Sequence, residues 1–429
     1  MDAPHPRRLR PVPLPLSKEA DERFLNRIAY LIPEFPGQTH SFFWRERLAL
    51  LECGIATHLV STRRPPREIV CSEWSDQAQR ETIYLNEMGM RQIFSACLNF
   101  LRFGPSACFR TLSAALENCP PRYWPVNFAL ILLSVRLTGF VRANELTHIH
   151  SHSCGNSALI AMFANKLAGI SYSITLHGDL RDYGRQQRLK WRHARFAIVI
   201  TQQLFRQVQE SLSGALPPFV GLAPMGVNPE FFQRSKAYTP WRRDGQLRLF
   251  SCGRLNFIKG HQDLIHAVSI LKKRGYSTNL EIAGEDEAGG RGFRRELERL
   301  IVDLELSNSV TLLGAVSEGR VRQKLEDAHV FALASHHEPL GVAIMEALSC
   351  STPVVATNGG GVTELIDNGI DGCLVVPRNP TELADAIEHV AKNPALAFRL
   401  SNAGRIKILE RFSSRVSAAE IKRLLWQSS

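Results

Sequence analysis

Short apolar runs alternate with longer amphipathic stretches along most of the chain. In the first half, Ile28–Ile32 has the pattern of a buried strand, and a loop rich in proline and glycine follows it. The next stretch, Ser41–Cys53, has the pattern of a helix that ends at Gly54, and Ala56–Ser61 follows as a second strand. A strand, a helix and a strand in this order form the unit of a parallel, doubly wound sheet. The same pattern returns over His148–Ser151, Ser157–Ala168, Ser173–Leu176 and Ala197–Thr201.

A second alternating block follows a polar, basic stretch at 234–243, which we interpret as a linker. Its expected strands are Leu247–Ser251, Leu280–Ala283, Val310–Leu313, Val330–Ala334 and Pro353–Ala356. Its expected helices are His261–Lys273, Phe293–Leu304, Val321–Glu326, Gly341–Cys350 and Thr381–Lys392. We therefore predict an α/β protein with two Rossmann-like doubly wound domains, 25–236 and 237–408, that face a central cleft. A C-terminal helix, 409–429, is predicted to pack back toward the first domain.

Two segments depart from this alternation. Residues 1–24 have five prolines within the first fifteen positions and no apolar run of helical length, so we expect a disordered tail and no signal peptide. Residues 92–141 are predicted to form an apolar helical insert, which either lies on an anionic membrane surface or is buried against its own domain. No window of about eighteen uncharged apolar residues is present, so we expect no spanning helix. The insert is interrupted by Arg102, Arg110, Arg122 and Arg136.

Composition excludes several classes of protein. Of the 429 residues 44% are apolar, which is too many for a disordered chain, and the 29 glycines show no collagen-like period. The 52 Lys and Arg residues exceed the 41 Asp and Glu residues, and the resulting net charge of +11 favours an acidic partner. We exclude nucleic acid, because the positive charge is dispersed and forms no stripe interleaved with aromatic residues. The nine cysteines include no C-x-x-C pair, which favours a reducing, cytoplasmic compartment.

The strongest chemical signal lies where the fourth expected strand of the second block leads into a helix. A short polar loop there carries Glu338, and the helix begins near Leu340. The amides of Leu340, Gly341 and Val342 would form an anion site at the start of that helix. Glu346 lies about two turns further on, on an otherwise apolar face, where it could accept hydrogen bonds from a diol such as a ribose.

Other loops at expected strand ends also carry residues suited to a ligand. Arg254 comes directly off the strand Leu247–Ser251, and Lys259 precedes the next helix. A planar guanidinium and an ammonium five residues apart suit two linked phosphates. Gly284 and the glycine-rich stretch 358–364 leave later strands of the same sheet.

Taken together, these residues resemble the retaining glycosyltransferases of family 4, particularly those of the exopolysaccharide and colanic-acid type. The resemblance is strongest over 245–378, and the spacing of two glutamates with seven residues between them, followed by a glycine-rich loop, is specific in combination. The matching segments include Gly253-Arg254, Lys259-Gly260, Glu338-Pro339-Leu340-Gly341, Glu346-Ala347-Leu348 and Gly360-Gly361-Val362-Thr363-Glu364-Leu365. The resemblance implies a GT-B fold, a nucleotide-diphosphate sugar as co-substrate and no cofactor.

The resemblance also implies roles for individual residues. Arg254 and Lys259 would bind the diphosphate and stabilise it as the leaving group, Glu338 would lie against the donor sugar, and Glu346 would bind the ribose. His177, which follows the strand Ser173–Leu176, stands where family members often have an active-site histidine. We assign His177 to the catalytic set with Glu338, Arg254 and Lys259. The donor-binding set comprises Arg254, Lys259, Gly284, Leu340, Gly341, Val342 and Glu346.

On the acceptor side we assign Gly37, His40 and His152. The loop 33–43 resembles the first-strand loop of exopolysaccharide-type members, but His40 stands where these have an acidic residue. Three histidines alternate over 148–152 on one strand face, although spacing provides no fourth ligand for zinc. We interpret His150 and His152 as residues at the strand end that line the cleft. We expect no metal, since no Asp-x-Asp motif occurs and Glu285-Asp286-Glu287 has the pattern of a solvated loop.

The sequence thus predicts a metal-independent retaining glycosyltransferase that extends a polysaccharide or lipid-linked acceptor. We expect a cytoplasmic protein, which would be peripheral at the inner face of the membrane if the insert 92–141 lies on that surface. Alternatives are a transferase acting on a small soluble acceptor and a nucleotide-sugar-binding protein without turnover. The intact set of Arg254, Lys259, Glu338 and Glu346 argues against the last. The mechanism would be front-face attack, in which the departing phosphate takes the acceptor proton, or a short-lived covalent intermediate on Glu338.

Overall fold

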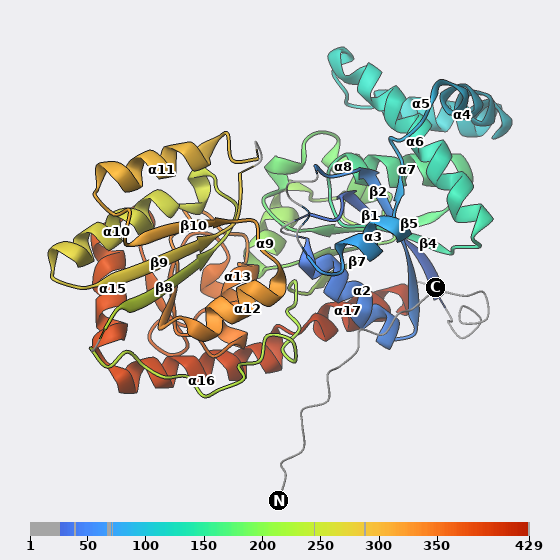
Figure 1. Ribbon diagram of the computed structural model, residues 1–429. Helices are drawn as coiled ribbons and strands as arrows, with labels where there is room; N and C mark the ends of the chain where they lie inside the picture. The colour runs from blue at the N-terminus through green and yellow to red at the C-terminus, as the bar shows by residue number, and fades with distance from the viewer. Residues whose placement is uncertain are drawn as a thin grey trace, which may run out of the picture.

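The computed structural model describes residues 26–37, 40–66, 70, 72–243, 245–286 and 289–427, so the predicted tail lies outside the described residues. The chain forms two α/β units side by side (Figure 1). The first contains a seven-stranded sheet of order β3-β2-β1-β4-β5-β6-β7, and the second a six-stranded sheet of order β10-β9-β8-β11-β12-β13. Every described strand pairing within these sheets is parallel, as the alternating pattern predicts.

The strands and helices of the first unit follow the predicted alternation, with the insert between β3 and β4. The strands are β1 (Asn26–Glu34), β2 (Ile55–Arg63), β3 (Ile83–Tyr84), β4 (His148–Ser151), β5 (Ser171–Leu176), β6 (Phe196–Val199) and β7 (Phe219–Leu222). The helices are α2 (Ser41–Glu52), α3 (Ser75–Glu81), α4 (Met90–Arg102), α5 (Pro105–Leu116), α6 (Trp124–Ala143), α7 (Asn156–Ala168), α8 (Gln187–Arg192) and α9 (Gln202–Ser211).

The second unit has the same organisation. Its strands are β8 (Leu247–Cys252), β9 (Thr278–Ala283), β10 (Val310–Gly314), β11 (Val330–Leu333), β12 (Val354–Thr357) and β13 (Cys373–Val375). Its helices are α10 (His261–Lys273), α11 (Phe293–Asp303), α12 (Glu318–Asp327), α13 (Val342–Ser349), α14 (Val362–Leu365), α15 (Pro380–Lys392) and α16 (Pro394–Arg411), and α17 (Ser414–Gln427) follows.

The chain returns from the second unit to the first at its C-terminal end. Val227 donates its N–H to the carbonyl of Phe412, and Ser414 donates to the carbonyl of Val227, both at 3.0 Å. This pairing ends α16, and α17 then packs against α2 and β7 (Figure 1). Its apolar side joins a core cluster that includes Tyr30 of β1 and Ile421.

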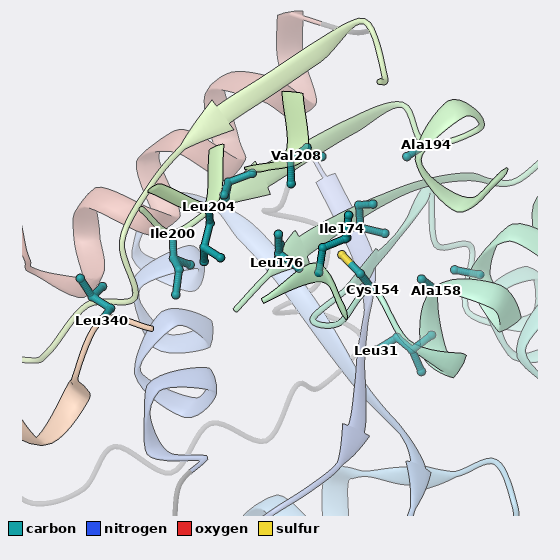
Figure 2. Close-up of a cluster of buried hydrophobic side chains, with 14 of the residues drawn as sticks. Leu31, Cys154, Ala158, Ile174, Leu176, Ala194, Ile200, Leu204, Val208 and Leu340 are labelled. Carbon is teal, nitrogen blue, oxygen red and sulfur yellow. The ribbon is translucent and has the colours of Figure 1, made fainter. Parts of the chain in front are cut away.

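The core runs across the boundary between the units. Figure 2 shows Leu340, from the second unit, at the edge of a cluster that contains Ile200 and Leu204 of the first. The predicted linker is also packed: Tyr238 is buried, and its hydroxyl donates to the carbonyl of His329 at 2.8 Å. Continuous burial of apolar surface at the boundary holds the strand ends of the two sheets in a fixed relation.

The insert has features of both of its predicted alternatives. Helices α6 and α5 both pack on α7, and α6 buries one side, whereas α4 packs against α5 and α6 and lies farther from the sheet (Figure 1). Within α4 only Ala96 is buried. Residues Pro121–Ala143 are long and apolar enough to cross a membrane by length and composition alone, and 44% of that apolar window is buried in the protein. A core helix passes the same criterion, so this finding is weak support for a span, which the sequence did not lead us to expect.

Candidate active site

Lys259 and Glu338 form an ion pair at the strand ends of the second sheet. Lys259 ends a short 3₁₀ turn after β8, and Glu338 lies in the loop between β11 and α13. The Lys259 ammonium donates to Oε2 of Glu338, and the Ser335 hydroxyl donates to the same oxygen at 3.2 Å. The side chains of Lys259 and Glu338 are 18% and 10% exposed, so Lys259 keeps a small accessible surface whereas Glu338 is nearly buried.

The glycine-rich stretch 358–364 holds the backbone of Glu338 in place. The Glu338 amide donates to the carbonyl of Gly359 at 3.1 Å, and the Gly361 amide donates to the carbonyl of Glu338 at 2.9 Å. A Cβ on Gly361 would lie 2.0 Å from the carbonyl oxygen of Pro339. Glycine is therefore required there, because the two loops approach more closely than any side chain allows.

Arg254 lies beside Gly284 of the predicted donor set. A Cβ on Gly284 would lie 1.9 Å from the carbonyl oxygen of Gly253, so the loops after β8 and β9 pack backbone to backbone. Arg254 also acts across the cleft on His40. Burial and the charge of Arg254 lower the pKa of His40 to about 4, which leaves that imidazole neutral. The structure thus brings a predicted donor residue near a predicted acceptor residue.

The predicted anion site lies at the start of α13. The helix begins at Val342, and Gly341 precedes it with a φ of +103°. Leu340 is buried and packs in the cluster shown in Figure 2. The three amides of Leu340, Gly341 and Val342 therefore stand on a loop anchored by an apolar side chain.

Glu346 has a partner that sequence analysis did not anticipate. Arg45 of α2, in the first unit, donates to Oε1 of Glu346 at 2.6 Å and also pairs with Glu318 of α12. The Arg45 guanidinium lies 4.8 Å from the ring centroid of Phe232. Burial raises the pKa of Glu346, and the charge of Arg45 opposes that shift. This triad joins the two units; Arg45 and Glu346 are buried, and the side chain of Glu318 is 18% exposed.

His177 and His152 lie in contact beneath the cleft. Nδ1 of His152 is 3.2 Å from Nε2 of His177, and Nε2 of His152 is 3.1 Å from Oε2 of Glu46. Glu46 comes from α2 and is buried, with Tyr30 and Ser417 donating to its carboxylate. Burial alone would raise the pKa of Glu46, but His152 and its other partners lower it to about 2. Glu46 has no local signal in the sequence, because the pattern of Ser41–Cys53 is defined by its apolar residues.

The other strand histidines are fully hydrogen-bonded to hydroxyls of β5. His148 contacts Ser171 and Ser173 at 2.8 and 2.7 Å, and His150 contacts Ser173 and Thr175 at 2.7 and 3.0 Å. Ligand atoms of Glu46, His150 and His152 lie within 4.8 Å of one another, close enough for one ion. Both ring nitrogens of His150 already have hydroxyl partners, which favours a hydrogen-bonded cluster over a metal centre.

Several predicted residues have surroundings different from those expected. His150 and His152 are 0% and 2% exposed, so they lie beneath the cleft and do not line it. The expectation of a solvated acidic loop was wrong for Asp286, which is 3% exposed. Its carboxylate accepts from the amides of Gly290, Gly292 and Arg294 and so orders the loop before α11. Glu287 lies outside the described residues.

Further contacts join the two units. Nε2 of His337 is 3.5 Å from Oδ2 of Asp179, and the carboxylate of Glu364 accepts from the amides of Gln202 and Gln203 at 2.7 and 2.8 Å. A carboxylate at the start of α9 is favourable, since free amides and the helix dipole meet there.

The predicted acceptor loop is described only in part. Gln38 and Thr39 lie outside the described residues, whereas Gly37 is described and its carbonyl accepts from the amide of His40 at 3.0 Å.

Comparison with known proteins places the similarity mainly in the second unit. Residues 239–407 match the family described as Glycosyl transferases group 1. D-inositol 3-phosphate glycosyltransferase from Pseudarthrobacter chlorophenolicus is 31% identical over 212 residues, which are 47% of this chain and 49% of that protein. The chain thus spans about half the length of the curated relatives it matches.

Solved structures resemble the whole described fold. Sucrose-phosphate synthase from Thermosynechococcus elongatus has a TM-score of 0.71 at 20% identity, with 94% of this chain and 100% of that chain covered. Anabaena Alr3699/HepE in complex with UDP-glucose has a TM-score of 0.70 at 16% identity, with 94% and 99% covered. The chain therefore has the GT-B fold, two Rossmann-like domains facing a cleft, as the sequence predicted. Its second domain matches the Glycosyl transferases group 1 family.

Proposed function

We propose that this protein is a retaining glycosyltransferase that moves a sugar from a nucleotide-diphosphate sugar to a polysaccharide or lipid-linked acceptor. The observation that carries the proposal is the Lys259–Glu338 pair at the strand ends of the second sheet, in which the lysine side chain is 18% exposed. The match of residues 239–407 to Glycosyl transferases group 1 supports it, as does the solved complex of HepE with UDP-glucose. The family 4, exopolysaccharide-type assignment belongs to this proposal.

The donor diphosphate would be bound by Arg254 and Lys259. In the protein as described, Lys259 already holds a carboxylate, that of Glu338, and a phosphate oxygen is a comparable partner for an ammonium. When a phosphate oxygen replaces the Glu338 carboxylate as the partner of Lys259, Glu338 would become free to face the donor sugar. Glu346 would accept from the ribose, and this requires the Arg45 contact to loosen or share the carboxylate. Gly284 and the amides at Leu340, Gly341 and Val342 complete the proposed donor site.

The reaction would proceed without a divalent metal. Negative charge grows on the diphosphate as the glycosidic bond breaks, and fixed cations aimed at that charge lower the barrier. Arg254 and Lys259 would supply these cations. We favour front-face attack, in which the departing phosphate takes the proton of the acceptor hydroxyl, so that the step needs no carboxylate nucleophile.

The insert suggests where a lipid-linked acceptor would be met. Met90, Phe94, Leu98 and Leu101 follow one another at helical spacing on α4 and are between 44% and 83% exposed. Phe109 on α5 is 73% exposed. We propose that this apolar stripe, with the neighbouring arginines, binds the anionic inner face of the cytoplasmic membrane. Arg136 is not part of this surface, because its guanidinium donates to the carbonyls of Leu85 and Glu87.

Turnover of a nucleotide sugar tests the proposed function. Purified protein is incubated with UDP-, GDP- and ADP-sugars, with and without membrane lipid extract, and nucleotide release is measured. We expect release with one donor, stimulated by the extract, and loss of release in Lys259→Ala. Lys273→Ala, an exposed lysine at the end of the helix that follows Lys259, is the matched control. Binding of a donor without release under every condition would favour the non-catalytic alternative, and release with a soluble acceptor alone would favour the small-acceptor one.

Flotation with vesicles tests the membrane surface separately. We expect the protein to float with phosphatidylglycerol vesicles and not with neutral phosphatidylcholine vesicles. A Phe94→Ser, Leu101→Ser double variant should lose flotation. Phe398→Ser, at a 50% exposed phenylalanine on α16, should keep it. Equal flotation of both variants would exclude α4 as the binding surface.

A further inference from the structure

His336 lies where three loops at the strand ends of the second sheet meet. It stands two residues before Glu338, in the loop between β11 and α13. Its amide donates to the carbonyl of Ile258, the neighbour of Lys259, at 2.7 Å. A Cβ on Gly359, in the glycine-rich stretch after β12, would lie 2.4 Å from the carbonyl oxygen of His336. The loops that carry Lys259, Glu338 and Gly359 therefore pack around the backbone of this one residue.

The imidazole of His336 extends this junction to the helix that follows Lys259. Its Nε2 is 2.7 Å from Oδ2 of Asp263, and the two side chains are 7% and 16% exposed. Asp263 lies in the first turn of α10, where a carboxylate also meets the free amides and the positive end of the helix dipole. Its amide donates to the carbonyl of Gly260 at 2.9 Å. The side-chain pair thus ties the start of α10 to the loop that carries Glu338.

Other groups enclose the same ring. Nε of Arg378, which follows β13, donates to Nδ1 of His336 at 3.4 Å. The amide nitrogen of Gln262 is 3.4 Å from Nε2, and Phe257 meets the ring edge-on, with centroids 4.9 Å apart. Of the polar partners Asp263 is the nearest, so its carboxylate is the contact that determines where the imidazole points.

The loop around Lys259 depends on such contacts because burial of its side chains does not hold it. Phe257 and Ile258, the two residues before Lys259, are 56% and 54% exposed. Gly260, which follows, packs against the end of β11: a Cβ there would lie 1.9 Å from the carbonyl oxygen of Ala334. An ammonium on a flexible four-carbon side chain can change partners, but a displaced backbone would carry it away from them. A fixed backbone is therefore needed if the ammonium is to move from a carboxylate to a phosphate.

We propose that Asp263 and His336 are positioning residues, which hold the loop 256–260 so that Lys259 can pass from the carboxylate of Glu338 to the diphosphate of the donor. The contacts that hold the loop belong to the protein alone. The role of these contacts in turnover rests on the proposed function.

Hydrogen exchange measured by mass spectrometry on the full-length protein tests the loop without any donor. We expect the amides of 256–264 to exchange about 3-fold to 10-fold faster in Asp263→Ala and in His336→Leu, because one or two hydrogen bonds that hold the loop are lost. Glu296→Ala removes an exposed acidic residue from the first turn of α11 and should leave the exchange of 256–264 unchanged. Unchanged exchange in both Asp263→Ala and His336→Leu would overturn the proposal.

Kinetics separate a positioning role from a merely structural one. Where a donor is turned over, Asp263→Ala and His336→Leu should each lower kcat by about 10-fold and change KM for the donor by less than about 3-fold, because Lys259 acts on charge that grows in the transition state. In the Lys259→Ala background, Asp263→Ala should lower kcat further by no more than about 2-fold, since the two residues act through one group. An equal fall of kcat in both backgrounds would overturn the proposal.

A conservative variant keeps the test decisive if His336→Leu does not fold. A glutamine side chain also places an N–H near the position of Nε2, so His336→Gln can still donate to Asp263. We expect His336→Gln to keep the exchange and the kcat of the wild type within about 3-fold. If it instead behaved like Asp263→Ala, the contact between the two side chains would not be what holds the loop. Failure of turnover in the wild type would contradict the proposed function, and the exchange of 256–264 would still decide whether Asp263 and His336 hold the loop.

Discussion

The two domains place their polar side chains differently around the cleft. In the second domain, Lys259 and Glu338 stand on strand-end loops and remain partly exposed. In the first domain, Arg45 and Glu46 are buried on a helix and pair with groups far away in the chain. A partly exposed ammonium such as that of Lys259 can exchange its carboxylate partner for a ligand, whereas a buried charge such as that of Arg45 is costly without its partner. Replacement of Arg45 or Glu46 should therefore lower mainly the free energy of unfolding. Replacement of Lys259 should lower mainly the catalytic activity.

The largest expected effect is on stability and comes from Arg45. Replacement by Met keeps the length of the side chain but leaves Glu318 and Glu346 together without a cation. We expect the free energy of unfolding to fall by about 3–5 kcal/mol, as for other broken buried ion pairs. Urea unfolding followed by circular dichroism measures it.

Arg415 provides the matched control for Arg45. It also pairs with two glutamates, Glu52 at 3.1 Å and Glu230 at 2.9 Å, but all three side chains are about 60% exposed. Arg415→Met should cost less than about 1 kcal/mol, since exposed ion pairs contribute little. If Arg45→Met and Arg415→Met lowered the free energy of unfolding equally, the burial of Arg45 would not account for its contribution to stability.

The next effect is on activity and comes from Lys259. Lys259→Ala should lower kcat of the proposed reaction by about 10²-fold to 10³-fold, because one fixed donor to the growing charge is lost. Its unfolding free energy should change far less than that of Arg45→Met. Steady-state kinetics with the active donor and urea unfolding of the same preparation measure both. A variant with normal kcat and impaired folding would reverse the assignment of the two domains.

Local patterns in the sequence identified the second domain well. Helix α10 begins and ends at the predicted residues, because its apolar spacing and its preceding glycine are local signals. The predicted final helix 409–429 was wrong at its start, since α16 continues to Arg411 and α17 begins at Ser414. That break is set by pairing with Val227, which lies far away in the chain and leaves no local signal.

The candidate site shows the same limit. Motif spacing was enough to single out Arg254, Lys259 and Glu338, all on loops of one sheet. The contacts of Arg45 and Glu46 could not be predicted, because a charged residue on a helix usually faces solvent. Their partners, Glu346 and His152, come from other elements, and only the fold brings them together.

A smaller effect concerns the dependence of stability on pH. His148 is buried between two serine hydroxyls, and burial is the main cause that lowers its pKa to about 3. Because the folded pKa lies below the unfolded value of about 6.5, the unfolded chain binds the proton more readily, and stability is lost as pH falls from about 6.5 toward 3. At pH 5 this one group should account for about 2 kcal/mol.

Urea unfolding at pH 7 and pH 5 measures this loss. We expect His148→Asn to lose about 2 kcal/mol less than the wild type between the two pH values. His389→Asn, at an exposed histidine on α15, should follow the wild type. The same pH dependence in His148→Asn and the wild type would mean that His148 is charged in the folded protein.

The smallest expected effect comes from Ser317, the residue that caps the start of α12 next to Glu318. Ser317 caps this helix, with its hydroxyl accepting from the amide of Arg320 at 3.3 Å, and Glu318 follows it directly. Ser317→Ala should lower the free energy of unfolding by about 1 kcal/mol, since a capping acceptor is lost, while Ser317→Thr should lower it less because it keeps the hydroxyl. In the Arg45→Met background, where Glu318 no longer has its cation, the two losses should not add, because the residues act through one network. Additive losses in urea unfolding of the double variant would mean that the cap stabilises α12 alone, and that the contact between Arg45 and Glu318 does not depend on the helix terminus.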